Sequence, residues 1–169
     1  MAHGTVLSKL VDAALILACL SVSALGFQRL SENRPPNSAV PPAAKTGDRI
    51  ELAGYNFSGA PDTLLLVVSS HCPYCQESMD FYSRLGQMST RRTGHLKLVV
   101  VGVEPTDTLT SYLAANHVEV DQVLTVPLGA LPSPSTPTLL RVNSKGIVVQ
   151  TWRGLQAPSS EAEIIRTLS

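Results

Sequence analysis

The sequence has little charge, and no excess of either sign. Only 15% of its 169 residues are charged, and Lys plus Arg and Asp plus Glu number 13 each. About a quarter is usual for a soluble domain. A nucleic-acid-binding protein needs a basic excess to pair with phosphates, so this balance argues against nucleic acid as a partner. It also excludes an acidic disordered tail protein.

Cysteine is scarce as well. The chain has three cysteines, too few for a small domain held together by disulfides. Its length suits one domain of ordinary size. Without disulfides, such a domain depends on a hydrophobic core, and 44% of the residues are apolar.

Much of the apolar content lies at the N-terminus. Residues 10–27 read LVDAALILACLSVSALGF, with Asp12 as the one charge. A helix of this length spans roughly 27 Å, just enough to cross a hydrocarbon core. Because the run is long for a signal peptide, we interpret residues 1–30 as an uncleaved signal-anchor. The alternatives are a cleaved signal peptide and a lipoprotein attached through Cys19. The signal-anchor and the cleaved signal peptide both place the rest of the chain outside the cytoplasm.

A proline-rich spacer follows the apolar segment. Residues 31–46 read SENRPPNSAVPPAAKT and show no periodic apolar pattern. Proline fixes φ and lacks an N–H group, so we expect a stiff, extended linker. Residues 47–169 are then a single globular domain. This domain is slightly acidic, because four of the 13 basic residues but only two of the 13 acidic ones precede Gly47.

The patterns in this domain predict an α/β fold. Apolar runs and alternation predict strands at 64–69, 95–103, 118–126, 138–142 and 147–152. Helical periodicity predicts helices at 73–88 and 106–116, and a last one beginning at Ser159 or Ser160. Residues 49–57 are expected to add a peripheral strand or hairpin. The order predicts a mixed sheet with helices on both faces, its last two strands joined by a turn at 143–146.

The chemistry is expected between the first core strand and its helix, in Ser-His-Cys-Pro-Tyr-Cys at 70–75. A cysteine at a helix N-terminus faces unpaired N–H groups, which favour the nucleophilic thiolate. Pro73 suits the first helical turn, where its missing N–H costs nothing. We therefore predict that Cys72 attacks disulfides and that Cys75, nearly one turn on, resolves the mixed disulfide.

Other roles for the Cys72–Cys75 pair have less support in the sequence. A zinc site needs two further ligands, and the chain has no second cysteine pair. A c-type haem needs a histidine after the second cysteine, where Gln76 stands. An inert structural disulfide stays open, although a strand-to-helix junction is an unusual place for one. We predict no metal and no cofactor beyond the redox-active Cys72–Cys75 disulfide.

The strand, the C-P-Y-C pair opening a helix, and the later Ser-Thr-Pro-Thr-Leu-Leu at 135–140 resemble the thioredoxin fold over residues 47–169. The resemblance implies that Pro137 follows Thr136 through a cis bond and faces the cysteines. In that family the backbone beside this proline pairs with an incoming chain and keeps metal ions from the thiols. The anchor, the spacer and the extra segment 96–126 are similar to extracytoplasmic TlpA-like redoxins.

Several positions depart from this family. His71 replaces the tryptophan that usually precedes the first cysteine, and Leu66 replaces the buried acid. Proton transfer to Cys75 must therefore use another group or water, and Glu77 and Glu104 are the candidates.

Further residues of the motif are candidates for shaping the site. Two interpretations of His71 stay open: a protonated His71 lowers the pKa of Cys72, or His71 simply flanks the site in an exposed position. Tyr74, between the cysteines, is expected to be exposed and to contact partners.

These features predict a membrane-tethered thiol–disulfide oxidoreductase outside the cytoplasm, which is the periplasm in a Gram-negative cell. Its expected partners are cysteine-containing extracytoplasmic proteins and a membrane thiol–disulfide donor or acceptor. The direction of electron flow stays open. A redoxin with peroxidase activity and a copper chaperone on the same fold are the alternatives.

Overall fold

The computed structural model describes residues 42–92 and 94–168. They belong to one compact unit, residues 40–169. The predicted membrane segment at 10–27 and most of the spacer lie outside the described residues. Within the described part, no helix is both long enough and apolar enough to cross a membrane.

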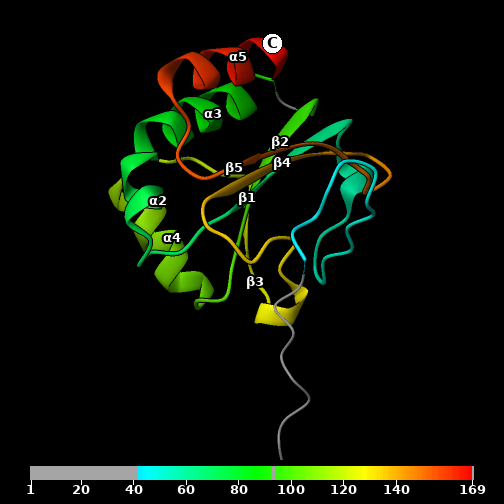
Figure 1. The fold of residues 1–169 in the computed structure, drawn as a ribbon, viewed down its shortest axis with the longest axis horizontal. Helices are drawn as coiled ribbons and strands as arrows, with labels where there is room; N and C mark the ends of the chain where they lie inside the picture. Colours follow the sequence, from blue (N-terminus) through cyan, green and yellow to red (C-terminus); the bar gives the residue numbers. More distant parts are fainter. Residues whose placement is uncertain (1–41, 93, 169) are drawn as a thin grey trace, which may run out of the picture. The chain divides into compact units, whose positions relative to one another are not determined.

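A five-stranded mixed sheet forms the centre of this unit, in the order β3-β2-β1-β4-β5 (Figure 1). The strands are β1 (Asp62–Val67), β2 (Leu96–Gly102), β3 (Gln122–Thr125), β4 (Thr138–Asn143) and β5 (Val148–Arg153). β1, β2 and β3 are parallel neighbours, while β4 lies antiparallel to both β1 and β5. The predicted core strands and the terminal hairpin are confirmed. The third strand is shorter than expected.

The central strands are buried on both faces, so successive side chains enter two different cores. Leu64 and Leu66 of β1 join one cluster of buried residues, and Leu65 and Val67 join the other. This arrangement explains why the strand reads as a continuous apolar run rather than an alternating one.

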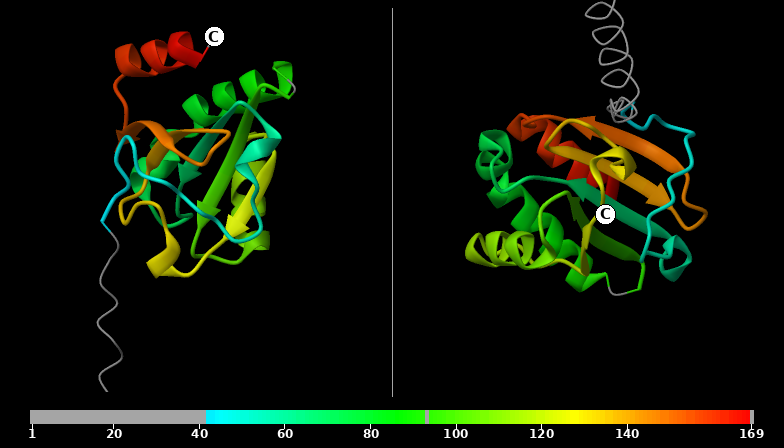
Figure 2. Two further views of the ribbon diagram at one scale, coloured as in Figure 1. Left: turned by 90° about the vertical axis from the view of Figure 1, so that its right-hand side faces the viewer. Right: turned by 90° about the horizontal axis from the view of Figure 1, so that it is seen from below.

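The α-helices lie on one face of the sheet, where we expected helices on both (Figure 2). They are α2 (Pro73–Glu77), α3 (Met79–Arg91), α4 (Thr106–Ala115) and α5 (Pro158–Leu168). β1, β2 and β3 follow one another across the sheet, and right-handed crossovers then put α3 and α4 on the same side. The other face is covered by the segment around Ile50–Phe57 and by the loop that contains Leu131.

A short helical turn takes the place of the peripheral strand or hairpin that we expected. Residues 49–57 form no strand or hairpin of their own. Arg49 makes a single bridge to Ile147, and the segment ends in the 3-10 turn η1 (Phe57–Gly59). A second 3-10 turn, η2 (Leu128–Ala130), lies between β3 and β4.

The predicted helix at 73–88 is divided at Ser78. Ser78 ends α2 and precedes α3 with φ −94° and ψ 3°. Its hydroxyl donates to the carbonyl oxygen of Tyr74 at 2.8 Å. Such back-bonding by serine bends helices. The cysteine pair therefore lies on a short helix of its own.

Candidate functional site

Cys72 lies at the junction of β1 and α2, as predicted. It is the N-cap residue of α2, and Pro73 occupies the first helical turn. The backbone N–H of Cys75 donates to Cys72 Sγ at 3.3 Å. This N–H, which also donates to the Cys72 carbonyl oxygen at 3.1 Å, thus lies close to the sulfur at the start of the helix.

The two thiols differ in their protonation. Burial raises the pKa of Cys72, but hydrogen bonds from the Thr136 and Cys75 side chains, and from the backbone N–H groups of Cys75 and Tyr74, outweigh it and hold the pKa below 9.0. Burial and the hydrogen bond to Cys72 raise the pKa of Cys75 to about 12. At neutral pH, Cys72 is the better nucleophile and Cys75 stays a thiol that donates to it.

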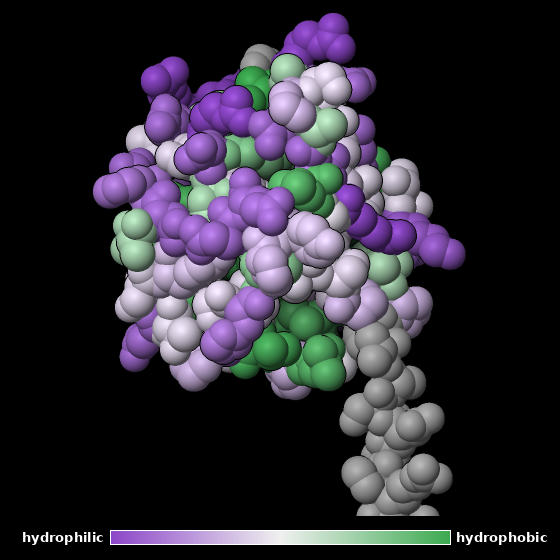
Figure 3. Space-filling view, turned by 60° about the vertical axis from the view of Figure 1, so that its left-hand side comes forward, coloured by the Kyte–Doolittle hydropathy of each residue, from purple (hydrophilic) through white to green (hydrophobic). Residues whose placement is uncertain are grey.

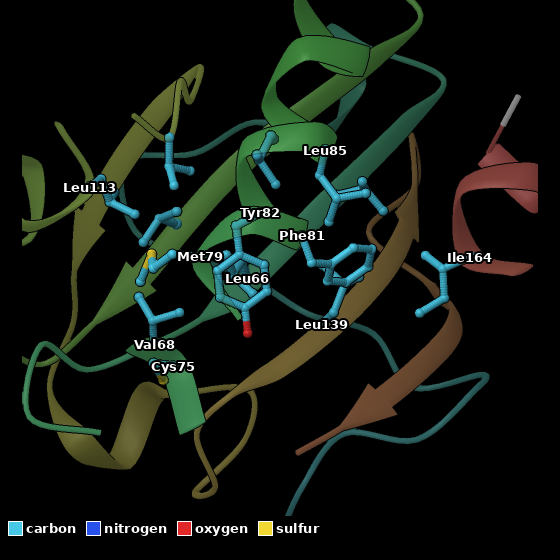
Figure 4. Packing of buried hydrophobic residues seen from close by; sticks show 14 of the residues in the cluster. Leu66, Val68, Cys75, Met79, Phe81, Tyr82, Leu85, Leu113, Leu139 and Ile164 are labelled. Carbon is cyan, nitrogen blue, oxygen red and sulfur yellow. The ribbon is translucent and has the colours of Figure 1, made fainter. Parts of the chain in front are cut away.

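Burial separates the roles of the two sulfurs in the same way. Cys72 is half-buried, while Cys75 is fully buried and belongs to the core cluster on the helical face (Figure 4). An incoming disulfide therefore reaches Cys72 first. Both cysteines are free thiols in this structure.

Thr136 and Pro137 lie beside Cys72, although they are distant from it in sequence. The protonated Cys72 thiol donates to the carbonyl oxygen of Thr136 at 3.4 Å. The Thr136–Pro137 bond is cis, as the resemblance to the thioredoxin fold implied, and Pro137 is buried. Thr136 thus borders the attacking sulfur with both its carbonyl and its side chain.

A buried group of hydroxyls, which was not predicted from the sequence, supports this loop. Ser133 and Thr138 are both fully buried. Their hydroxyls lie 2.9 Å apart, and Thr138 also donates to the carbonyl oxygen of Ser135 at 2.7 Å. The group satisfies polar atoms that would otherwise be unpaired in the core beside Pro137.

The other predicted site residues surround Cys72 at the surface. His71, Pro73 and Tyr74 are exposed, and Tyr74 is 57% exposed. Glu77 is also exposed, at the end of α2. The predicted influence of His71 on Cys72 stays a prediction.

The contacts of Glu104 indicate a role other than proton transfer to Cys75. Its carboxylate accepts hydrogen bonds from the backbone N–H and the hydroxyl of Ser70. Burial raises the pKa of Glu104, but hydrogen bonds from Ser69 and Ser70, helped by the nearby His71, lower it below its ordinary value. A carboxylate kept ionised by such bonds is a poor proton carrier at neutral pH. We interpret Glu104 as an anchor for the loop that precedes Cys72.

Two tyrosines that interact with the cysteines were not predicted as site residues from the sequence. Burial raises the pKa of Tyr82 on α3, and Cys75 and Cys72 raise it further. Burial, Cys75 and Cys72 raise the pKa of Tyr112 on α4 to about 12. Their helical spacing predicted only core positions.

No group of three or more His, Cys, Asp or Glu in the described part is arranged to hold a metal ion. The chemistry available to the site is that of the two thiols. A reactive half-buried thiol next to a protonated buried one can form, and then release, a mixed disulfide.

No protein-family model matches the sequence, and no curated protein matches it significantly. Solved structures do match. The chain is similar to a Chlorobium tepidum protein with the provisional name thiol:disulfide interchange protein DsbE (20% identity, TM-score 0.57), over 75% of this chain and 100% of that one. It is also similar to the thioredoxin domain of a thiol-disulfide oxidoreductase from Bacteroides vulgatus (14% identity, TM-score 0.55), over 75% of this chain and 100% of that one.

A peroxiredoxin-like protein from Aquifex aeolicus matches as well (12% identity, TM-score 0.52), over 77% of this chain and 91% of that one. At these identities the likeness concerns the fold. The described domain has the thioredoxin fold, as the sequence predicted.

Proposed function

We propose that this chain is a thiol–disulfide oxidoreductase that exchanges disulfides with cysteines of other proteins. The observation that carries the proposal is the contrast within one helical turn between Cys72, a half-buried N-cap residue whose sulfur accepts from the Cys75 N–H at 3.3 Å, and Cys75, which is fully buried. This geometry accompanies a lowered pKa of Cys72 and a pKa of Cys75 raised to about 12. A structural disulfide has no need of such a contrast, whereas sequential attack and resolution depend on it.

The surface around Cys72 suits a protein substrate. Tyr74, Val103 and Leu128 are large exposed apolar residues. They lie in segments that follow β1, β2 and β3, and parallel strands end at one edge of a sheet. Figure 3 shows apolar side chains gathered at the lower end of the domain, below a largely hydrophilic surface. Exposed apolar surface of this kind favours binding of another chain.

We further propose that the domain works outside the cytoplasm, tethered through residues 1–30. The apolar run at 10–27 and the proline-rich spacer after it support this location. Its partners are then extracytoplasmic proteins with cysteines, and a membrane protein that returns it to its working redox state. A reporter fused after Ser169 should be active outside the cytoplasm, and a cytoplasmic signal would contradict this topology.

The activity is tested with the full chain in detergent, in a Cys19→Ala background so that only the pair reacts. The purified protein should catalyse the reduction of insulin disulfides by dithiothreitol, and its reduction potential should be measurable against glutathione. Cys72→Ser should abolish catalysis. Activity that survives Cys72→Ser would overturn the assignment of the nucleophile.

The same preparations distinguish the alternatives. Consumption of hydrogen peroxide without insulin reduction would favour the peroxidase. Tight binding of one copper(I) ion without disulfide exchange would favour the copper chaperone.

A further inference from the structure

A hydroxyl near the buried cysteine lacks a partner. The Oη atom of Tyr112 is buried and has no hydrogen-bond partner among the described residues. A buried donor left unpaired costs free energy, so its persistence needs an explanation. Catalytic sites supply one when a donor is directed at a position where charge develops only during the reaction.

Two hydrogen bonds join α2, which carries Cys75, to the end of α4, which carries Tyr112. The side chain of Gln76, next to Cys75, donates to Asn116 Oδ1 at 2.9 Å. Asn116 in turn donates to the backbone carbonyl oxygen of Tyr112 at 2.8 Å. Tyr112 also packs against the buried cluster that contains Cys75.

The groups that act on the Tyr112 phenol are those of the site. Burial is the largest cause of its raised pKa, and Cys75, Cys72 and Glu104 raise the pKa further, in that order. Tyr82 also interacts with the two cysteines and with Tyr112, but its hydroxyl already bonds to Ser78. Among the described residues, the Tyr112 hydroxyl is therefore the buried donor on this side of Cys75 that has no partner.

We propose that the Tyr112 hydroxyl donates a hydrogen bond to the Cys75 thiolate when that thiolate forms. The proposal rests on the function proposed above. It assigns to Tyr112 the stabilisation of Cys75 in a chain where Leu66 stands in place of a buried acid.

The step balances in either direction. The Cys75 thiol gives its proton to water, and its sulfur attacks Cys72 in the mixed disulfide. The Cys72–Cys75 bond forms, the bond from Cys72 to the partner sulfur breaks, and the partner thiolate leaves and takes a proton from water. In reverse, a partner thiolate attacks Cys72, Cys75 leaves as thiolate, and the proton returns to it from water. Tyr112 bonds to the same thiolate in both directions.

The resolving step can be measured alone. In the Cys19→Ala background, Cys72 is converted to a mixed disulfide with 5-thio-2-nitrobenzoate, and release of the coloured thiolate reports the attack by Cys75. Tyr112→Phe should slow release about tenfold, the order of one charge-assisted hydrogen bond. The ratio of the wild-type rate to the variant rate should stay constant as long as the pH is below the pKa of Cys75. The titratable or charged groups facing this site are Cys72, Tyr82, Glu104 and His71, and the variant retains all of them.

A structural role would give a different result. Because Tyr112→Phe removes an unpaired buried hydroxyl, its midpoint of thermal unfolding should equal or exceed that of the wild type. Tyr55→Phe is the matched control, since the Tyr55 hydroxyl bonds to Thr63 at 3.0 Å and its ring packs with the other core. That variant should lose stability and keep the wild-type release rate.

The outcomes separate the two proposals. Release from Tyr112→Phe at the wild-type rate would overturn the role of Tyr112 and leave the oxidoreductase intact. A wild-type protein that neither releases the coloured thiolate nor reduces insulin would overturn the proposed function itself. Slow release together with lost thermal stability would identify Tyr112 as a packing residue and would also reject the proposal.

Discussion

Both carboxylate oxygens of Glu104 accept hydrogen bonds from the backbone N–H of Ser70, at 3.0 and 3.2 Å. The Ser70 hydroxyl donates to the same carboxylate. Glu104 follows β2 and Ser70 follows β1, so the bonds join two neighbouring strand ends just before Cys72. The conformation of the cysteine loop thus depends on an acid that lies far from it in sequence.

Glu104→Gln should therefore destabilise the domain and slow insulin reduction severalfold. The amide retains one acceptor but loses the charge, and for a half-exposed, solvent-screened group we expect about 1 kcal/mol in the free energy of unfolding. A lowered native pKa gives stability that is present above the unfolded value of 4.5 and is lost as pH falls through the native pKa. Urea unfolding of both proteins from pH 7 to pH 3 should show the difference shrinking below about pH 4.5.

Glu77→Gln is the control for this measurement. Glu77 is exposed at the end of α2, and substitution there should change stability by no more than about 0.5 kcal/mol. Equal effects of the two substitutions would contradict the anchoring role of Glu104.

Cys75→Ser should trap partner proteins on Cys72. The variant keeps the attacking thiol but replaces the resolving sulfur with a hydroxyl, which does not displace a disulfide. Mixed disulfides should then last at least about tenfold longer than in the wild type, because resolution is lost while attack remains. Non-reducing electrophoresis and mass spectrometry of the Cys19→Ala background would identify them. Cys75→Ser should form no such adducts once Cys72 is also replaced by serine.

The sequence predicted the parts of this site that depend on local order. The C-P-Y-C motif after an apolar strand was enough to place Cys72 at a helix start, because strand, cap and proline are local signals. The resemblance to the thioredoxin fold added the cis bond before Pro137.

The remaining features depend on which segments the fold brings together. Nothing local shows that Glu104 bonds to Ser70, or that Tyr112 lies by the cysteines, since each contact crosses from one strand-helix unit to another. The break at Ser78 was missed because the apolar pattern continues across it at helical spacing. The position of α3 and α4 on the same face follows from strand order, which the patterns left open.

Thr138→Val should reveal the support behind Pro137. Valine matches threonine in shape but leaves the buried Ser133 hydroxyl and the Ser135 carbonyl with one partner fewer. The expected loss is about 1–3 kcal/mol in the free energy of unfolding, measured with urea. The double variant Ser133→Ala/Thr138→Val should cost less than the sum of the single changes. Each single change already breaks the bond between the two hydroxyls and leaves one of them unpaired, whereas the double variant leaves neither hydroxyl behind. Additive losses would show that the two hydroxyls act independently.

The raised pKa of Cys75 predicts that the reduced domain weakens in alkali. A thiol with a pKa of about 12 in the native state and 9.0 when unfolded stabilises the protein below pH 9, and this contribution is lost as pH rises toward 12. The loss is up to about 1.4 kcal/mol per pH unit. The contribution of Cys72 to stability depends on pH in the opposite direction. Because its pKa is lowered in the native state, this contribution grows as pH rises to about 9.

Urea unfolding of the reduced wild type and of reduced Cys75→Ala between pH 8 and pH 11.5 would measure this contribution. The advantage of the wild type should decline above pH 9, while the burial that chiefly raises the pKa of Tyr82 and Tyr112 is common to both proteins. Parallel stability curves would mean that Cys75 ionises as easily in the folded chain as in the unfolded one. The raised pKa that separates Cys75 from Cys72 would then not exist.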